Sequence, residues 1–118
     1  MIAGTTFKSF LQGEIVLLPY PFGDLSGTKK RPAIVISNKT VNSKTQDLIL
    51  AQITHNLRND EFSFTLKNED LDKPLKYQSE IRCHKIFTAD KSIIIDRISS
   101  LKASKISTIL EKIATFIS

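Results

Sequence analysis

Residues 13–38 read GEIVLLPYPFGDLSGTKKRPAIVISN, and this stretch decides which fold the chain can adopt. It holds two short apolar runs, Ile15–Leu18 and Ala33–Ile36, which are bounded by turn-forming residues. Runs of this kind are typical of β-strands. The segment between them contains prolines and glycines and ends in the basic cluster Lys29–Arg31. We therefore expect two strands joined by a long loop. Long loops in small domains are usually functional or disordered, and the basic end of this one could bind an anion.

Further strand patterns follow along the chain. Leu48–Thr54 is apolar on both faces in its first half, which is typical of a central, buried strand. Residues 62–67 alternate between apolar and polar side chains, as does Ser79–Phe87, and this period of two indicates half-buried strands. Ser92–Ile98 is predicted to be a further strand. The polar segments between these strands predict loops at residues 38–47, 55–61 and 68–76 and a turn at 88–91.

The last part of the chain has the pattern of an amphipathic helix. We expect Ser99 or Ser100 to cap its N-terminus, because serine oxygens accept hydrogen bonds from the first backbone N–H groups of a helix. Apolar residues then recur at spacings of three and four, at Ala103, Ile106, Leu110, Ile113 and Ile117. Several short strands and one terminal helix predict a mainly β fold, a small, strongly bent antiparallel sheet or barrel with an appended C-terminal helix.

Length and composition limit the chain to one domain and a few classes of protein. Its 118 residues suffice for a single domain, which we place at residues 1–118. No apolar run reaches the ~20 residues of a membrane span, and the first residues lack the ~7–15-residue apolar core of a signal peptide. Cys83 is the only cysteine, which excludes an internal disulfide. We therefore expect a cytoplasmic protein with no membrane association.

The charge of the chain favours an anionic partner. Lysine and arginine number 17 against 12 acidic residues, for a net charge of +5, which fits RNA or an acidic protein segment. The sequence has no phosphate-binding P-loop, no HExxH, no Cys/His zinc spacing and no GxSxG motif. We interpret the one tight group of acids, Glu69, Asp70 and Asp72, as a solvated surface rather than a metal site. We therefore expect no metal and no other cofactor.

What remains is a set of cations and hydroxyl groups at predicted strand ends: Ser26, Arg31, Thr54, Arg82 and His84. This set suits the metal-free cleavage of RNA by its own 2′-OH, which needs a base near the 2′-OH, an acid near the leaving 5′-oxygen and cations on the phosphate. Arginine donates paired hydrogen bonds to phosphate oxygens, and histidine exchanges a proton near neutral pH. Arg82 and His84 are two residues apart in an alternating strand, so we expect both on one face. Taken alone, arginine, threonine and histidine residues in such positions are more often ordinary surface or strand residues.

Three segments, in order, resemble the motifs of the PemK/MazF-type toxins of bacterial toxin–antitoxin systems, which are small ribonucleases that need no metal. The matching segments are Gly13–Val16 with Arg31–Ile36, then Ala51–Thr54, then residues 79–91 with Arg82, Thr88 and Asp90 at the marked positions. Three motifs in the right order are far more specific than any one of them. The resemblance covers most of the chain and implies an SH3-like barrel with appended helices.

The resemblance implies roles for single residues. Arg31 matches the arginine that family members place on the scissile phosphate, and Thr54 matches the threonine beside it. Arg82 matches an arginine assigned to catalysis in a plasmid-encoded branch, in which an aspartate two residues later is the proposed base. His84 stands at that position here, so roles cannot be copied across, and the base stays open between His84, Thr54 and a water. The residues that match the loop bordering the RNA groove are Ser26, Lys29, Lys30 and Arg31.

The resemblance also implies a function and partners. It implies the toxin of a type II toxin–antitoxin system, an endoribonuclease that cuts single-stranded mRNA at specific sequences and leaves a 2′,3′-cyclic phosphate. It implies a homodimer and a cognate antitoxin whose tail blocks the RNA groove. Two alternatives stay open: a non-catalytic toxin of the same fold, like the gyrase-poisoning CcdB-like proteins, and an RNA-binding barrel that does not cut. Arg31 together with Thr54 favours the ribonuclease, because gyrase poisoning would require neither.

Overall fold

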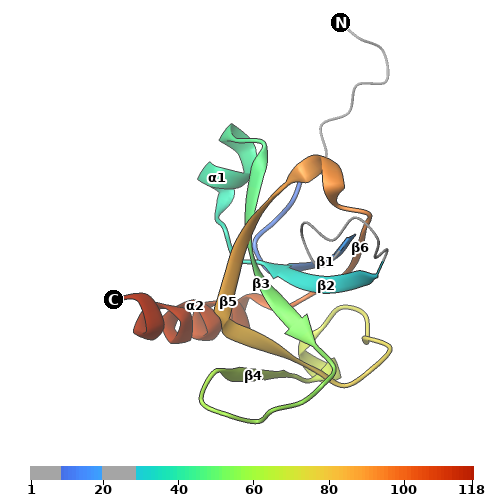
Figure 1. The fold of residues 1–118 in the computed structure, drawn as a ribbon, viewed down its shortest axis with the longest axis vertical. Coiled ribbons are helices and arrows are strands. Elements are labelled where there is room, and N and C mark those ends of the chain that lie inside the picture. Colours follow the sequence, from blue (N-terminus) through green and yellow to red (C-terminus); the bar gives the residue numbers. More distant parts are fainter. Residues whose placement is uncertain (1–8, 20–28) are drawn as a thin grey trace, which may run out of the picture.

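The described part of the chain is built around one bent antiparallel sheet (Figure 1). The structure is a computed structural model that describes residues 9–19 and 29–118. The sheet has the strand order β4-β5-β3-β2-β1-β6. Its strands are β1 (Glu14–Pro19), β2 (Lys30–Val35), β3 (Asp47–Thr54), β4 (Ser63–Leu66), β5 (Ser79–Asp90) and β6 (Asp96–Ser100). The helices are α1 (Lys39–Lys44) and α2 (Ala103–Ile117). The predicted class, mainly β with a C-terminal helix, is confirmed.

The sheet bends because β5 carries an irregularity in its middle. Ala51 of β3 pairs with Ile86, whereas Ile53, only two residues further on, pairs with Ile81. Residues 82–85 of β5 therefore lie opposite Gln52 alone. Extra residues on one strand of a pair bend it and increase its twist, and such bulges are frequent next to active sites. The first residues of β5 also pair with β4, so the bend lies where the sheet turns toward its β4 edge.

Two apolar clusters lie on opposite faces of the central strands. Successive residues alternate between them: Ile15 and Ile34 belong to the first cluster, and Val16 and Val35 to the second, as the pleat of a strand requires. The first cluster includes Ile109 and Ile113 of α2. β3 contributes buried residues to both clusters, which confirms that Leu48–Thr54 is buried on both faces.

Gly13 brings α2 against the start of β1. It has a positive φ of 96°, which glycine adopts without strain, and a Cβ at this position would clash with the side chain of Ile106. The Gly13 N–H donates to the carbonyl of Val35 over 2.8 Å, and its own carbonyl accepts from the Leu101 N–H over 2.9 Å. The glycine therefore joins β1, β2 and the approach to α2 at one point.

The predicted loop at residues 38–47 is wrong in part, because it contains α1. Asn38 caps this short helix by accepting a hydrogen bond from the Val41 N–H over 3.3 Å. Asn42 is buried, and its side-chain amide donates to the carbonyl of Ser37 over 2.9 Å. A polar segment with one buried asparagine has no apolar stripe, so hydrophobic periodicity could not show this helix.

The predicted boundary between the last two strands is also displaced. β5 continues through Asp90, where a turn was expected, and the chain reverses in a 3-10 turn at Lys91–Ile93. Asp90 caps this turn by accepting from the Ser92 N–H over 2.8 Å. β6 consequently begins at Asp96 rather than Ser92.

α2 begins later than predicted, and its packed face keeps the predicted Ile106 and Ile113 but is shifted at both ends. Ser99 and Ser100 lie in β6, paired with β1, so neither caps the helix, which starts after Lys102. Ile109 and Ile113 are its buried residues, with Ile106 and Phe116 partly buried beside them. The ends of the predicted stripe, Ala103 and Ile117, are exposed. The packed side of α2 is set by the contact of Ile106 with Gly13 and by the packing of Ile109 and Ile113 on the sheet.

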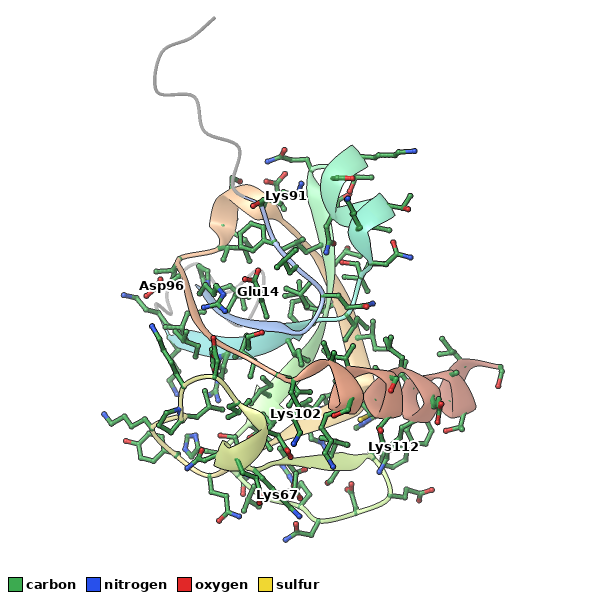
Figure 2. All side chains as sticks on the ribbon, turned by 180° about the vertical axis from the view of Figure 1, so that it is seen from behind. Glu14, Lys67, Lys91, Asp96, Lys102 and Lys112 are labelled. Atoms are coloured by element: carbon green, nitrogen blue, oxygen red, sulfur yellow. The ribbon has the colours of Figure 1, made fainter. Side chains whose placement is uncertain are left out.

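The acidic residues Glu69, Asp70 and Asp72 were predicted to form a solvated surface, and this prediction is wrong in part. Asp70 is buried and pairs with Lys102 over 2.8 Å, while Asp72 accepts from Arg97 over 3.0 Å. Figure 2 shows Lys102 close to the short turn that carries these acidic residues. These two carboxylates therefore hold the chain between β4 and β5 against β6 and the start of α2.

Candidate active site

A pocket of about 330 Å³ opens where β5 bends. Its walls come from β2, from the end of β3, from the bulged part of β5 and from the loop of residues 55–62, which we call the 55–62 loop. The lining residues are Arg31, Gln52, Ile53, Thr54, Arg58, Arg82, His84 and Lys85. The structure therefore brings together all four residues that the sequence singles out for catalysis, Arg31, Thr54, Arg82 and His84.

Arg31 and Thr54 reach the pocket through the register of β2 and β3. Ala33 pairs with Gln52, and two residues further along each strand stand Arg31 and Thr54. Antiparallel neighbours at the same level share a face of the sheet, so these two side chains follow Gln52 into the pocket. The Thr54 hydroxyl oxygen accepts from the Asn56 N–H over 3.0 Å, which leaves its proton free to be donated to a ligand.

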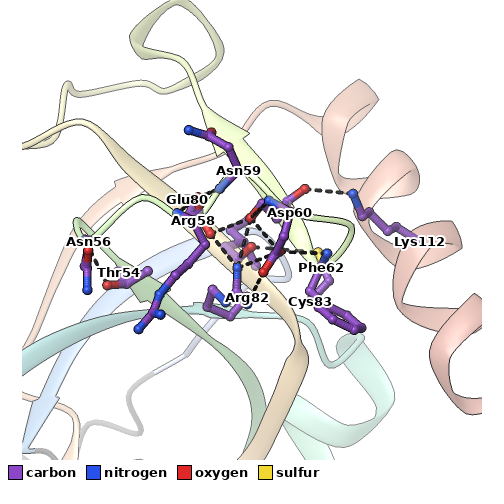
Figure 3. A network of polar contacts seen from close by, with 12 residues as sticks. Thr54, Asn56, Arg58, Asn59, Asp60, Phe62, Glu80, Arg82, Cys83 and Lys112 are labelled. Atoms are coloured by element: carbon purple, nitrogen blue, oxygen red, sulfur yellow. Dashed lines mark hydrogen bonds and ion pairs between the residues drawn. The ribbon is translucent and has the colours of Figure 1, made fainter.

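Arg82 is held by two carboxylates (Figure 3). Its guanidinium donates to both oxygens of Asp60 over 2.9 and 3.0 Å and to Glu80 over 2.7 Å. Its side chain is only 10% exposed. The hydrogen bond from Arg82 holds the pKa of Asp60 well below its ordinary value, and the hydrogen bond to Asp60 raises the pKa of Arg82. The positive charge of Arg82 is therefore already matched by protein carboxylates.

Glu80 is fully buried and holds the 55–62 loop through hydrogen bonds. One of its oxygens accepts from the backbone N–H groups of Arg58 and Asn59 over 2.9 and 3.2 Å, and the other accepts from the Ser63 hydroxyl over 2.6 Å. Burial by itself raises the pKa of Glu80, but these hydrogen bonds together with that from Arg82 outweigh it and hold the pKa below its ordinary value. Asn59 has a positive φ of 50°, which asparagine tolerates better than most residues.

His84 lies on the exposed side of the pocket. Its ring packs on Phe62, with ring centres 4.3 Å apart, and Phe62 in turn contacts Phe116 of α2 at 5.0 Å. Desolvation lowers the pKa of His84 below 6.5, and the neighbouring charges of Arg82 and Lys85 lower it further. A neutral imidazole at pH 7 can accept a proton, as a general base must.

The residues predicted to bind RNA are placed only in part. Ser26 lies outside the described residues. Lys29 and Lys30 are exposed at the start of β2, and neither lines the pocket. Arg31, the next residue, does line it. The basic cluster therefore leads from the surface to the mouth of the pocket.

Three polar residues of the lining, Gln52, Arg58 and Lys85, were not predicted as site residues. Gln52 could have been found, because it precedes Thr54 by two residues in a strand and so shares its face. Lys85 enters only through the bulge of β5, and Arg58 only through the fold of the 55–62 loop, and neither feature has a sequence pattern. Within residues 9–19 and 29–118, no group of three or more metal-ligating side chains is close enough to hold a metal ion.

A larger pocket, of about 650 Å³, lies between α1 and residues 9–11. Within residues 9–19 and 29–118, its charged lining residues are Lys39, Lys44 and Lys91, and none of its lining residues is an arginine or a histidine. It therefore lacks a group that exchanges protons near neutral pH, and the pocket at the bend of β5 is the better candidate for chemistry.

A bent antiparallel half-barrel with a C-terminal helix and a cation-lined pocket describes a known class of bacterial toxin fold. The sequence matches the family described as "PemK-like, MazF-like toxin of type II toxin-antitoxin system" over residues 11–117. The chain belongs to this family. Comparison with curated proteins gives no match.

Solved structures of family members share the fold at low sequence identity. MazF of Deinococcus radiodurans, from a MazE–MazF structure, is 18% identical, with a TM-score of 0.76 over 93% of this chain and 97% of that chain. A mycobacterial endoribonuclease solved with its cognate antitoxin is 20% identical, with a TM-score of 0.74 over 91% and 93% of the two chains. Mycobacterium tuberculosis toxin MazF-mt6 is 19% identical, with a TM-score of 0.69 over 86% and 93%. The predicted small barrel of the PemK/MazF type is thereby confirmed.

The described helices include none that is both long and apolar enough to cross a lipid bilayer.

Proposed function

We propose that this chain is a toxin endoribonuclease that cuts single-stranded mRNA without a metal. The observation that carries the proposal is the convergence of Arg31, Thr54 and His84 on one pocket. These groups supply a cation, a hydroxyl donor and a base, which are the groups that attack by the RNA's own 2′-OH requires. Membership of the toxin family and the distant likeness to endoribonucleases support it.

In the proposed reaction His84 accepts the proton of the 2′-OH. The 2′-oxygen then forms a bond to phosphorus and the bond from phosphorus to the 5′-oxygen breaks, which leaves a 2′,3′-cyclic phosphate and a free 5′-OH. In this open pocket the leaving 5′-oxygen takes its proton from water. Arg31 and the Thr54 hydroxyl donate to the phosphate oxygens, whose negative charge grows in the transition state.

The first experiment is to incubate the purified protein with mixed-sequence single-stranded RNA in EDTA and to map the ends of the fragments. We expect discrete cuts that end in a cyclic phosphate. Arg31→Ala should lower the cleavage rate by about 10²–10³-fold, the scale for loss of one preorganised donor. Lys39→Ala, which removes an exposed charge on α1, is the matched control and should cut normally.

Intact RNA after incubation with folded wild-type protein would contradict the proposal. Binding to RNA with a clear salt dependence but without scission would identify an RNA-binding barrel instead. Binding to neither RNA nor its fragments would favour a non-catalytic toxin that acts on a protein target.

We further propose that the chain acts in the cytoplasm as a homodimer that a cognate antitoxin inhibits. Relatives solved with their antitoxins support the antitoxin part of this proposal. Light scattering on the purified protein should give twice the mass of one chain. Co-purification with the product of an adjacent gene, together with loss of RNA cleavage in the complex, would identify the antitoxin.

A further inference from the structure

The cations of the pocket differ in whether the protein already neutralises them. Arg82 donates to Asp60 and Glu80, so its charge is balanced by two carboxylates. Arg58 lines the same pocket, but its guanidinium makes no hydrogen bond or ion pair with any residue in the described part of the chain. An arginine without a carboxylate partner keeps its donors for a ligand, and its planar fork matches the oxygens of a phosphate.

The backbone of Arg58 is fixed even though its side chain is exposed. Its N–H donates to the buried carboxylate of Glu80 over 2.9 Å, and the N–H of Asn59 donates to the same oxygen. Figure 3 shows the Arg58 side chain extending away from this network, on the same side as Thr54. A side chain that starts from a fixed backbone has less freedom to lose when it binds a ligand. The loop therefore presents Arg58 to the pocket rather than leaving it loose on the surface.

Glu80 and Arg82 together hold the loop in this position. Arg82 crosses from β5 to Asp60 in the loop and also donates to Ser63 at the start of β4 over 2.9 Å. Glu80 holds the residues on either side of the same turn. We propose that Arg58 is the second phosphate-binding arginine of the pocket, beside Arg31, and that Arg82 is a positioning residue that acts through the 55–62 loop. This inference rests on the proposed function, because the phosphate is that of the bound RNA strand.

The first test compares Arg58→Ala, Arg58→Lys and the control Lys39→Ala in the full chain. Two quantities are measured: the single-turnover rate of RNA cleavage, and the salt dependence of binding to the same RNA with a 2′-deoxy group at the cleaved nucleotide. Arg58→Ala should cut about 10²-fold more slowly. Its plot of log binding constant against log salt concentration should be less steep by about 0.7, the value for one phosphate contact on a single strand.

Arg58→Lys keeps the charge but not the paired donors, so it should retain the wild-type salt slope and recover part of the rate. Lys39→Ala should match the wild type in both measurements. A wild-type rate and slope in Arg58→Ala would overturn the inference. A slower rate with an unchanged slope would also overturn it, because Arg58 would then not touch the phosphate.

Asp60→Asn tests the role of Arg82 with a variant that keeps the buried pair with Glu80. If Arg82 positions the loop that carries Arg58, this variant should lower the cleavage rate, the RNA affinity and the salt slope, because Arg58 is then held less firmly at the phosphate. If Arg82 instead binds phosphate, loosening its partner frees the guanidinium, and RNA affinity and salt slope should both rise. The two roles therefore predict changes of opposite sign, and a rise in affinity would overturn the positioning role.

These readouts separate the inference from the proposed function. If the wild type binds the 2′-deoxy RNA but does not cut normal RNA, the proposed ribonuclease fails. The difference in salt slope between wild type and Arg58→Ala still decides whether Arg58 contacts phosphate.

Discussion

Two arginines of this protein are held in the same way at opposite ends of the sheet. Arg82 contacts the carboxylates of Asp60 and Glu80, and Arg97 contacts those of Glu14 and Asp72. We call each arginine with its two acids an arginine trio. In each arginine trio one acid is exposed and the other, Glu80 or Glu14, is buried. Figure 2 shows Glu14 on the far side of the sheet from the β4 edge. The same arrangement, an arginine between two acids, therefore occurs twice in the described residues.

The surroundings of the two arginine trios differ. The Arg82 side chain is 10% exposed and borders a pocket with other cations, whereas the Arg97 side chain is 39% exposed. Among the described residues, the small pocket beside Arg97 is lined by Ser9, Phe10, Ile94, Ile95 and Asp96, and these include no second cation. An arginine held between two acids is therefore a structural element, and the cations beside Arg82 define the candidate site.

The largest expected effect is on stability. Arg82→Ala leaves Glu80 buried without its compensating charge, and loss of one partner of a buried pair costs about 3–5 kcal/mol. Arg97→Ala also leaves a buried acid, Glu14, without its arginine, but the Arg97 side chain is 39% exposed, so water already screens that contact and the loss should be smaller. Urea unfolding of both variants at pH 7 measures the free energies. Equal losses would contradict the distinction between the two arginine trios.

The next effect concerns the pH dependence of RNA cleavage, which we attribute to His84 in the pocket beside Arg82. Because the pKa of His84 lies below 6.5, its base form predominates at pH 7 and is lost as the pH falls through that pKa. The cleavage rate should therefore be level near pH 7 and fall in acid. His84→Gln should cut about 10²-fold more slowly and lose this dependence.

His55→Gln is the matched control for that measurement. His55 is exposed and packs against Tyr77, with ring centres 5.0 Å apart, and it does not line the pocket. Its replacement should leave the pH profile unchanged. If His84→Gln retains the wild-type rate and profile, the base is Thr54 or a water.

The smallest effect is the acid sensitivity of the two arginine trios. Hydrogen bonds from arginine lower the pKa of Asp60 in one trio and of Asp72 in the other, and the pKa of Glu80 is also lowered. A lowered pKa means that the charged form stabilises the fold, so this stability is present above about pH 4 and is lost as the pH falls further. Urea unfolding between pH 7 and pH 3 should show the decline. Arg97→Ala should flatten it, because Asp72 then loses the hydrogen bond that lowers its pKa. Asp60→Asn should flatten it more, because the pKa of Asp60 is lowered further than that of Asp72.

The sequence predicted most of the fold because its strands follow simple rules. Alternation placed Ile81 and Cys83 opposite Arg82, and an apolar run marked β3 as central. It failed at α1 and at the start of α2, where a buried asparagine and the close approach at Gly13 decide the structure. Neither of these features has a periodicity that a single sequence can show.

The candidate site divides in the same way. Arg31 and Thr54 could be predicted, because they stand at strand ends and match recognised motifs. The neutralisation of Arg82 could not, since Asp60 is distant in the sequence and reaches it only through the 55–62 loop. The same loop brings Arg58 into the pocket, and its fold depends on a glutamate buried in β5.

By itself, then, the sequence determined the strands, their buried faces and the residue types at their ends, because side-chain polarity and strand period act locally. The tertiary structure alone decided which charges are matched and which face a ligand. A charge is neutralised by whatever lies within a few ångströms of it, and the bulge of β5 and the turn at Asn59 set those neighbours. The pairing of Arg82 and the availability of Arg58 are therefore properties of the folded chain.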